Sequence, residues 1–164
     1  MALRAQVGFT RVELVVVIVV VGMVAAVAVP RYRGYEMNER VAAVKNMGGM
    51  LKSAALTAHA VCQAESCVNN QTLVIQGQRV TFLNGYPDAA SIGRLLPKTD
   101  GFTPNGAGNR FTLNGAKTAD CWVQYDNATS EADVLSPPTI SYQAGTITDK
   151  ASEQSVNAAL QTQC

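Results

Sequence analysis

The chain has 164 residues, which is enough for one domain of ordinary size. Its 13 Lys and Arg residues nearly balance its 12 Asp and Glu residues, and this argues against nucleic acid as the main partner. The single histidine, His59, excludes a His-rich metal site, and we expect neither a metal nor a cofactor.

The first predicted element is an apolar helix. Residues 14–29 contain no charged side chain. As a helix they would be ~24 Å long at ~1.5 Å per residue, which approaches the ~30 Å hydrocarbon core of a bilayer. The segment is rich in valine, which favours strands, but a lone strand in lipid leaves its backbone groups unpaired. We therefore predict a helix that spans a membrane.

A secretory signal peptide is one interpretation of this segment. Arg4 and Arg11 supply a basic start, and the valine run supplies an apolar middle. Ala26-Val27-Ala28 matches an A-x-A cleavage site. Cleavage after Ala28 would release a soluble protein that begins at Val29.

A short leader is the second interpretation. Residues 1–8 would be removed, and the apolar helix would be kept. Glu13 favours this interpretation, because a carboxylate beside an apolar run is costly in a bilayer and has no use in a disposable signal. Ionisable groups in membranes usually have a partner and a role, so we expect both for Glu13.

The segment from Gly8 to Leu14, Gly-Phe-Thr-Arg-Val-Glu-Leu, resembles the prepilin processing motif of type IV pilins and pseudopilins. The resemblance implies that a dedicated peptidase cuts after Gly8 and methylates the new N-terminal amine of Phe9. Glu13 is then the fifth residue of the mature chain. The family implies that Glu13 of one subunit pairs with the Phe9 amine of its neighbour during assembly.

Two further positions match the family. Gly22 corresponds to a glycine that loosens the helix, and Pro30 corresponds to the proline that follows. The departure from the pattern is Arg11, where the family nearly always has an apolar residue. In the family the glycine and the proline let the helix loosen and lengthen, so Gly22 and Pro30 imply a compliant fibre.

Past Pro30 the apolar residues become periodic. Spacings of three or four separate Val41, Val44, Gly48, Leu51, Ala55, Ala58 and Cys62. This pattern predicts an amphipathic helix whose narrow apolar stripe is covered by a head domain. With the first segment it makes one long helix over residues 9–61, of which 9–30 belong to the membrane or filament core, kinked or loosened near Gly22 and Pro30.

Residues 62–164 are predicted to form a β-rich head. Strand-like runs cover residues 73–75, 79–83, 111–113, 121–125, 140–142 and 146–148. Turn pairs such as Asn84-Gly85 and Asn114-Gly115 separate them. Residues 87–92 are expected to start a short helix. We therefore predict an α+β fold, a long N-terminal helix packed on an antiparallel sheet.

Four cysteines, Cys62, Cys67, Cys121 and Cys164, suggest two disulfides outside the membrane. Three pairings are possible. Local spacing favours Cys62 with Cys67, which leaves Cys121 with Cys164. The second pair resembles the carboxy-terminal disulfide-bounded region of type IV pilins, and it would hold the polar tail as a stapled flap. Zinc is disfavoured, because the cysteine spacing and one histidine make a poor ligand set.

A finer resemblance leads to the major pilins of mannose-sensitive haemagglutinin pili, a branch of type IVa filaments used in surface attachment. Four segments carry it, namely 41–45, 53–62, 85–89 and 121–125. It implies a major pilin that assembles as a homo-oligomeric helical filament for adhesion or motility. The implied partners are the prepilin peptidase, the assembly machinery and the inner membrane. The precursor would have a cytoplasmic N-terminus, and the assembled pilus would be extracellular.

Two alternatives stay open within and outside this family. The first is a pseudopilin of a type II secretion system or a minor pilin, which the terminal cysteine pair disfavours. The second is a secreted soluble binding domain cut after Ala28. We do not expect an enzyme, because the sequence offers no convergent acid, base and nucleophile.

Overall fold

The computed structural model describes residues 9–97, 99–131, 134–143 and 145–164. The predicted leader, residues 1–8 with Gly8, lies outside the described residues. Two helices, one 3-10 helix and ten strands are assigned within the described part. In chain order they are α1 (Arg11–Ala64), β1 (Thr72–Ile75), β2 (Gln78–Leu83), β3 (Tyr86–Pro87), η1 (Ile92–Leu95), β4 (Phe102–Pro104), β5 (Arg110–Leu113), β6 (Trp122–Asp126), β7 (Thr129–Glu131), β8 (Val134–Ser136), β9 (Thr139–Tyr142), β10 (Gly145–Thr146) and α2 (Lys150–Gln163).

Helix α1 is continuous over 54 residues, and its bounds lie within three residues of the predicted 9–61. The helix assignment runs through Gly22 and Pro30. The chain forms two compact units, Met1–Met37 and Asn38–Cys164. The second half of α1 therefore belongs to the same unit as the strands, which we call the head.

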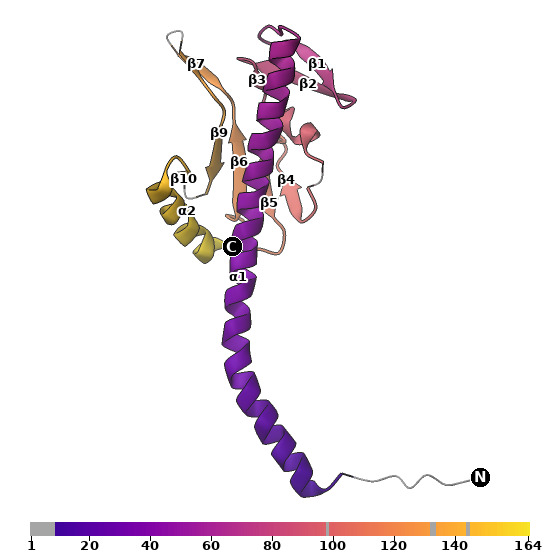
Figure 1. Cartoon of the computed structure of the whole chain (residues 1–164), viewed down its shortest axis with the longest axis vertical. Helices are drawn as coiled ribbons and strands as arrows, with labels where there is room; N and C mark the ends of the chain where they lie inside the picture. The colour runs from indigo at the N-terminus through magenta and orange to yellow at the C-terminus, as the bar shows by residue number, and fades with distance from the viewer. Residues whose placement is uncertain (1–8, 98, 132–133, 144) are drawn as a thin grey trace, which may run out of the picture. The chain divides into compact units, whose positions relative to one another are not determined.

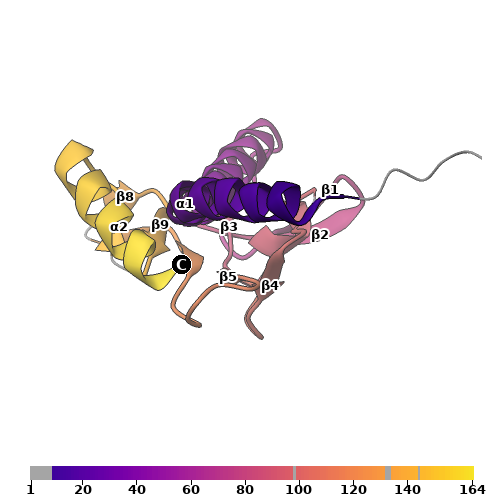
Figure 2. The same ribbon diagram turned by 90° about the horizontal axis from the view of Figure 1, so that it is seen from below.

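All the strand pairs are antiparallel, as predicted. The largest sheet has five strands in the order β10-β9-β6-β5-β4. A three-stranded sheet, β1-β2-β3, and a hairpin, β7-β8, complete the head. Figure 1 shows the second half of α1 lying along these strands, and Figure 2 shows α2 beside β9, away from β4 and β5.

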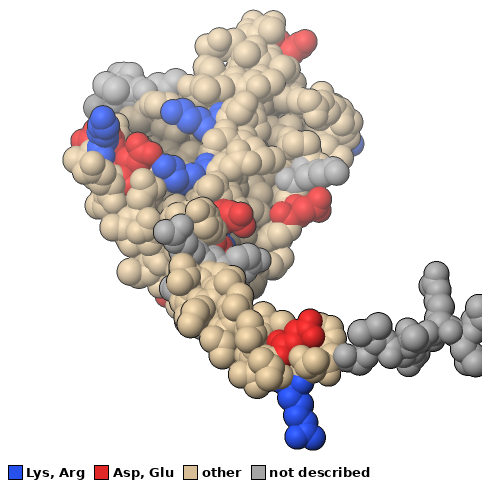
Figure 3. All heavy atoms as spheres, turned by 60° about the horizontal axis from the view of Figure 1, so that its bottom comes forward, with Lys and Arg blue, Asp and Glu red and all other residues tan. Residues whose placement is uncertain are grey.

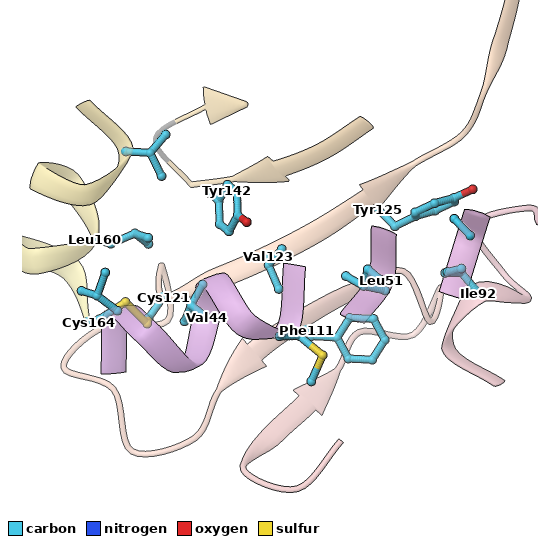
Figure 4. Close-up of a cluster of buried hydrophobic side chains, with 14 residues drawn as sticks. Val44, Leu51, Ile92, Phe111, Cys121, Val123, Tyr125, Tyr142, Leu160 and Cys164 are labelled. Atoms are coloured by element: carbon cyan, nitrogen blue, oxygen red, sulfur yellow. A yellow bond between two sulfur atoms is a disulfide. The ribbon is translucent and has the colours of Figure 1, made fainter. Parts of the chain in front are cut away.

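The main core lies between α1 and the five-stranded sheet. The register places Phe111 opposite Val123 and Val123 opposite Tyr142, so one row of side chains crosses three strands. All three side chains are buried against α1 residues such as Val44 and Leu51 (Figure 4). Fully burying a side chain such as Leu51 contributes about 1.5–3 kcal/mol. This packing is what joins the helix to the sheet.

The predicted apolar stripe of α1 is confirmed as a core face. Its members are all buried, and Met47, which the spacing left out, joins them. A second, smaller cluster lies further along α1, where Ala58 and Cys62 contact Val80 and Phe82 of β2. The stripe is therefore covered by two sheets in succession.

Three local predictions in the head are corrected. The short helix expected over residues 87–92 is wrong, because Pro87 ends strand β3 and the 3-10 helix η1 begins at Ile92. The strand expected over residues 146–148 stops at Thr146. The C-terminal flap is instead the helix α2.

Helix α2 forms because its start is capped and one face is buried. The Asp149 side chain accepts a hydrogen bond from the Ser152 backbone N–H, and Ser152 Oγ bonds back to the Asp149 backbone in a capping box. Val156, Leu160 and Cys164 follow at intervals of four, and all three are buried in the core. The apolar face thus lies on one side of a polar helix.

Candidate functional site

The first turn of α1 contains the residues of the predicted assembly motif. Thr10 is the N-cap residue, because its Oγ1 accepts a hydrogen bond from the Glu13 N–H at 3.2 Å and its carbonyl accepts one from the Leu14 N–H at 3.1 Å. Glu13 is then the third residue of the helix, where a carboxylate is favoured by the helix dipole. The Thr10-x-x-Glu13 spacing is itself a capping-box signature, so these residues also mark the start of the helix.

Phe9 and the uncharged run of residues 14–29 expose an extensive apolar surface. Phe9 is 72% exposed, and Arg11–Val29 is by length and composition able to cross a membrane, with none of it buried in the described structure. In Figure 3 the surface of this helix is tan beyond the charged groups at its start. A contiguous apolar surface of this kind is unfavourable in water. Lipid or other protein must therefore cover it.

Gly22 lies within this apolar helix and has open space around it, since a Cβ at that position would meet nothing within 4 Å. The packing of this chain therefore gives no reason for a glycine there. Neither Gly22 nor Pro30 interrupts the helix assignment. The predicted loosening at Gly22 and Pro30 stays a prediction.

The four cysteines form two disulfides, Cys62–Cys67 and Cys121–Cys164. These are the two pairs that the sequence favours. The first joins the last turn of α1 to the residues that follow it, and the second joins the end of α2 to the start of β6 (Figure 4). Cys121 and Cys164 are both fully buried, so the second disulfide is part of the main core.

Further contacts attach α2 to the rest of the head. The Cys164 carbonyl accepts hydrogen bonds from Arg40 Nη1 at 2.9 Å and from the Lys117 N–H at 3.3 Å. Lys45 Nζ of α1 lies 2.5 Å from Glu153 Oε1 of α2. The Lys45 ammonium holds the pKa of Glu153 below its ordinary value. Helix α2 is therefore held to α1 by the Lys45–Glu153 ion pair and the Arg40 hydrogen bond, and to the sheet by the second disulfide.

Two buried tyrosines face α1 from the sheet. Tyr125 Oη donates a hydrogen bond to the Pro87 carbonyl at 2.8 Å, and its pKa is raised by burial and by the nearby Asp88. Burial also raises the pKa of Tyr142, with Glu153 adding to the effect. Gly48 of α1 leaves room for the Tyr142 ring, because a Cβ there would overlap the hydroxyl.

The single histidine has a structural environment. The His59 ring stacks on Tyr86 with 4.0 Å between the ring centroids, and its Nδ1 lies 2.6 Å from the Gly85 carbonyl oxygen. Within the described ranges, His, Cys, Asp and Glu side chains form no group of three or more that could hold a metal ion. The arrangement of His59 is that of a packed aromatic residue.

No family model matches the chain, and no solved structure matches it. It is 33% identical over 70 residues to a fimbrial protein of Pseudomonas aeruginosa, which is 43% of this chain and 44% of that protein. It is 36% identical over 52 residues to the type IV major fimbrial protein FimA of Dichelobacter nodosus, 32% of this chain and 33% of that protein. The chain thus spans less than half the length of these curated relatives. Over that part, the resemblance of this chain to the type IV pilin family is confirmed.

Proposed function

We propose that this chain is a structural subunit of a type IV pilus. Its role is mechanical: the helix Arg11–Val29 anchors the precursor in the inner membrane and then packs with the same helix of other subunits. The observation that carries the proposal is that none of this apolar helix is buried, in a chain whose head has its own core. The fimbrial relatives support it.

Processing is the first step. The peptidase removes residues 1–8 after Gly8, and the Phe9 amine becomes the methylated N-terminus. Thr10 then caps the helix one residue from that terminus. The mature chain therefore begins with a positive amine immediately before the helix, four residues ahead of the Glu13 carboxylate.

Pairing in the apolar core sets the register of assembly. A carboxylate left without a partner in an apolar environment costs several kcal/mol. The Phe9 amine of a neighbouring subunit relieves this cost only when the two helices are offset so that it reaches Glu13. Growth in any other register leaves both charges unpaired. Each added subunit is thereby directed to one position.

The test compares Glu13→Ala with Glu39→Ala, an exposed carboxylate of α1 outside the apolar segment. Intact mass is measured on filaments sheared from cells and on the cell envelope. We expect Glu13→Ala to be cleaved and methylated at Phe9 but absent from the sheared fraction. Glu39→Ala should assemble. Normal filaments from Glu13→Ala would contradict the proposed pairing of Glu13 with the Phe9 amine.

The same masses separate the alternatives. Abundant wild-type chain in the sheared fraction, starting at methylated Phe9, supports the pilus subunit. The processed chain in the envelope alone would identify a pseudopilin or a minor pilin. A soluble chain that begins at Val29 would overturn the proposal. Surface attachment, which the mannose-sensitive haemagglutinin resemblance implies, is then tested by comparing the adhesion of cells with and without filaments.

A further inference from the structure

A groove on the head is lined by residues of the unit Asn38–Cys164. Its walls are α1 on one side and the strands β9 and β10 on the other, and Glu153 of α2 lies at one end. Its volume is about 410 Å³, within the ~300–1,000 Å³ usual for small-molecule sites. Past Lys52 it adjoins an apolar recess of about 360 Å³, and the two share Lys52, Pro138 and Ile140. Figure 3 shows basic and acidic side chains around a hollow in the head.

Two consecutive glycines of α1 line this groove, but only one of them is explained by packing. Gly48 is buried under Tyr142. Gly49 is exposed, and a Cβ there would meet nothing within 4 Å. A glycine inside a helix lowers its stability relative to alanine, and the missing side chain at Gly49 leaves the backbone on this face of α1 accessible. Of the residues that the structure describes, none lies within 4 Å of that Cβ position, so a bound group can reach the backbone of α1 there.

The charge of the groove favours an anion. Lys45 and Lys52 lie four residues before and three residues after Gly49, so all three share one face of α1. Lys45 is neutralised by Glu153. Among the residues that the structure describes, Lys52 has no ion-pair partner. One ammonium group at the edge of the groove is therefore available to a ligand.

The opposite wall is rich in hydroxyl groups. Thr139, Thr146 and Thr148 line it, with Ile140 and Pro138 as apolar neighbours. Hydroxyls can donate and accept hydrogen bonds, and such a set suits a ligand that carries several hydroxyls of its own. The apolar neighbours suit the C–H face of a ring.

We propose that this groove binds an acidic sugar, a pyranose ring that carries a carboxylate. The Lys52 ammonium pairs with the carboxylate, and the threonine hydroxyls form hydrogen bonds with the ring hydroxyls. The missing side chain at Gly49 lets the ring approach α1. An acidic side chain of a neighbouring subunit would satisfy Lys52 alone and would leave the threonine wall unused. The proposal does not rest on the pilus function, because every feature of the groove lies within one chain.

The experiment is calorimetric titration of the full-length chain in detergent with galacturonic acid, with glucose and acetate as the neutral sugar and the bare carboxylate. We expect galacturonate to bind at least about tenfold more tightly than either, since the charge-assisted contact and the hydroxyl contacts both contribute. Lys52→Gln should weaken the binding of galacturonate by about tenfold and leave the binding of glucose unchanged. Lys117→Gln, an exposed lysine outside the groove, is the matched control.

A second variant tests the space rather than the charge. Gly49→Leu fills the hollow without a clash at Cβ, so it should fold and lose galacturonate binding. Ala60→Leu, at an exposed position of α1 outside the groove, should bind like the wild type. Acetate binding as tight as galacturonate, or full binding by Lys52→Gln, would overturn the proposal. So would loss of binding when subunits assemble into filaments, which would assign the groove to a neighbouring subunit.

Discussion

Lys45 of α1 and Glu153 of α2 form an ion pair, with 2.5 Å between Nζ and Oε1. The two residues are 108 positions apart in the chain. The pair is partly exposed, with 32% and 42% of the two side chains accessible, so it contributes less than a buried pair would. It nevertheless ties the C-terminal helix α2 to the second half of α1.

The first prediction concerns the stability of the folded chain at low pH. The pKa of Glu153 lies below its ordinary 4.5 in the folded chain, so the stability it contributes is present above pH 4.5 and is lost as pH falls below that value. Asp149, whose pKa is lowered from 3.8 by the Ser152 backbone N–H, acts in the same direction. Glu153→Gln should be less stable than the wild type at pH 7, and the gap should narrow toward pH 3. Denaturant unfolding as a function of pH measures this, with Glu65→Gln as the control.

A gap between wild type and Glu153→Gln that stays constant from pH 7 to pH 3 would contradict this assignment. It would mean that the contact stabilises the head through packing alone. The Glu65→Gln control keeps the net charge equal, so that general charge effects cancel between the two variants.

The second prediction uses the glycine pair of α1. Gly48→Ala should lower the free energy of unfolding by about 1–3 kcal/mol, because its Cβ overlaps the Tyr142 hydroxyl in a packed core. Gly49→Ala is the matched control and should raise the free energy of unfolding by up to about 1 kcal/mol, since nothing lies within 4 Å of its Cβ. Combining Gly48→Ala with Tyr142→Phe should recover part of the loss. Equal effects of the two alanines would refute the packing argument.

The third prediction orders the two disulfides. Cys121 and Cys164 are 43 residues apart, and Cys62 and Cys67 are five apart. From loop entropy, replacing Cys121 and Cys164 by alanine should cost about 4 kcal/mol, and replacing Cys62 and Cys67 about 2 kcal/mol. Denaturant unfolding of the two double variants measures the difference. A larger loss of stability in the Cys62/Cys67 variant would show that the disulfides do not stabilise the protein mainly by restricting the unfolded chain.

The fourth prediction concerns Tyr125. Tyr125→Phe leaves the buried Pro87 carbonyl without its hydrogen bond, which should cost about 1–3 kcal/mol. Burial raises the pKa of Tyr125 above the ordinary 10.0, so the wild type should lose stability as pH rises past 10.0, because only the unfolded chain ionises there. Tyr125→Phe should lose less over the same range. Tyr35→Phe, an exposed tyrosine, is the control and should match the wild type.

The features that the sequence predicted well are local or strongly periodic. The apolar segment, the core stripe of α1 and the Cys62–Cys67 disulfide needed only residue spacing within one segment, whereas the Cys121–Cys164 pair followed as the remaining one. Strand positions were also visible, because runs such as residues 79–83 lie between turn residues. The fold class followed from the order of these elements.

Helix α2 shows what spacing alone missed. Its capping residues, Asp149 and Ser152, and its buried face, Val156 and Leu160, were all present in the sequence. The polar composition of the segment concealed them, since only one narrow face is apolar. That face stabilises the helix only when it packs on the sheet, α1 and Cys121 in the folded core.

The sequence by itself determined the elements whose information is local: the apolar helix, the amphipathic continuation and the short disulfide. The processing motif with Phe9 and Glu13 is equally local and stays a prediction. Tertiary structure decided which distant residues meet. Gly48 fits Tyr142, Lys45 meets Glu153, and Lys52 faces the threonines of β9 and β10 only because the antiparallel register and the closure at Cys164 bring them together. Local spacing constrains neighbours along one helix or strand, whereas contacts between elements depend on how the whole core packs.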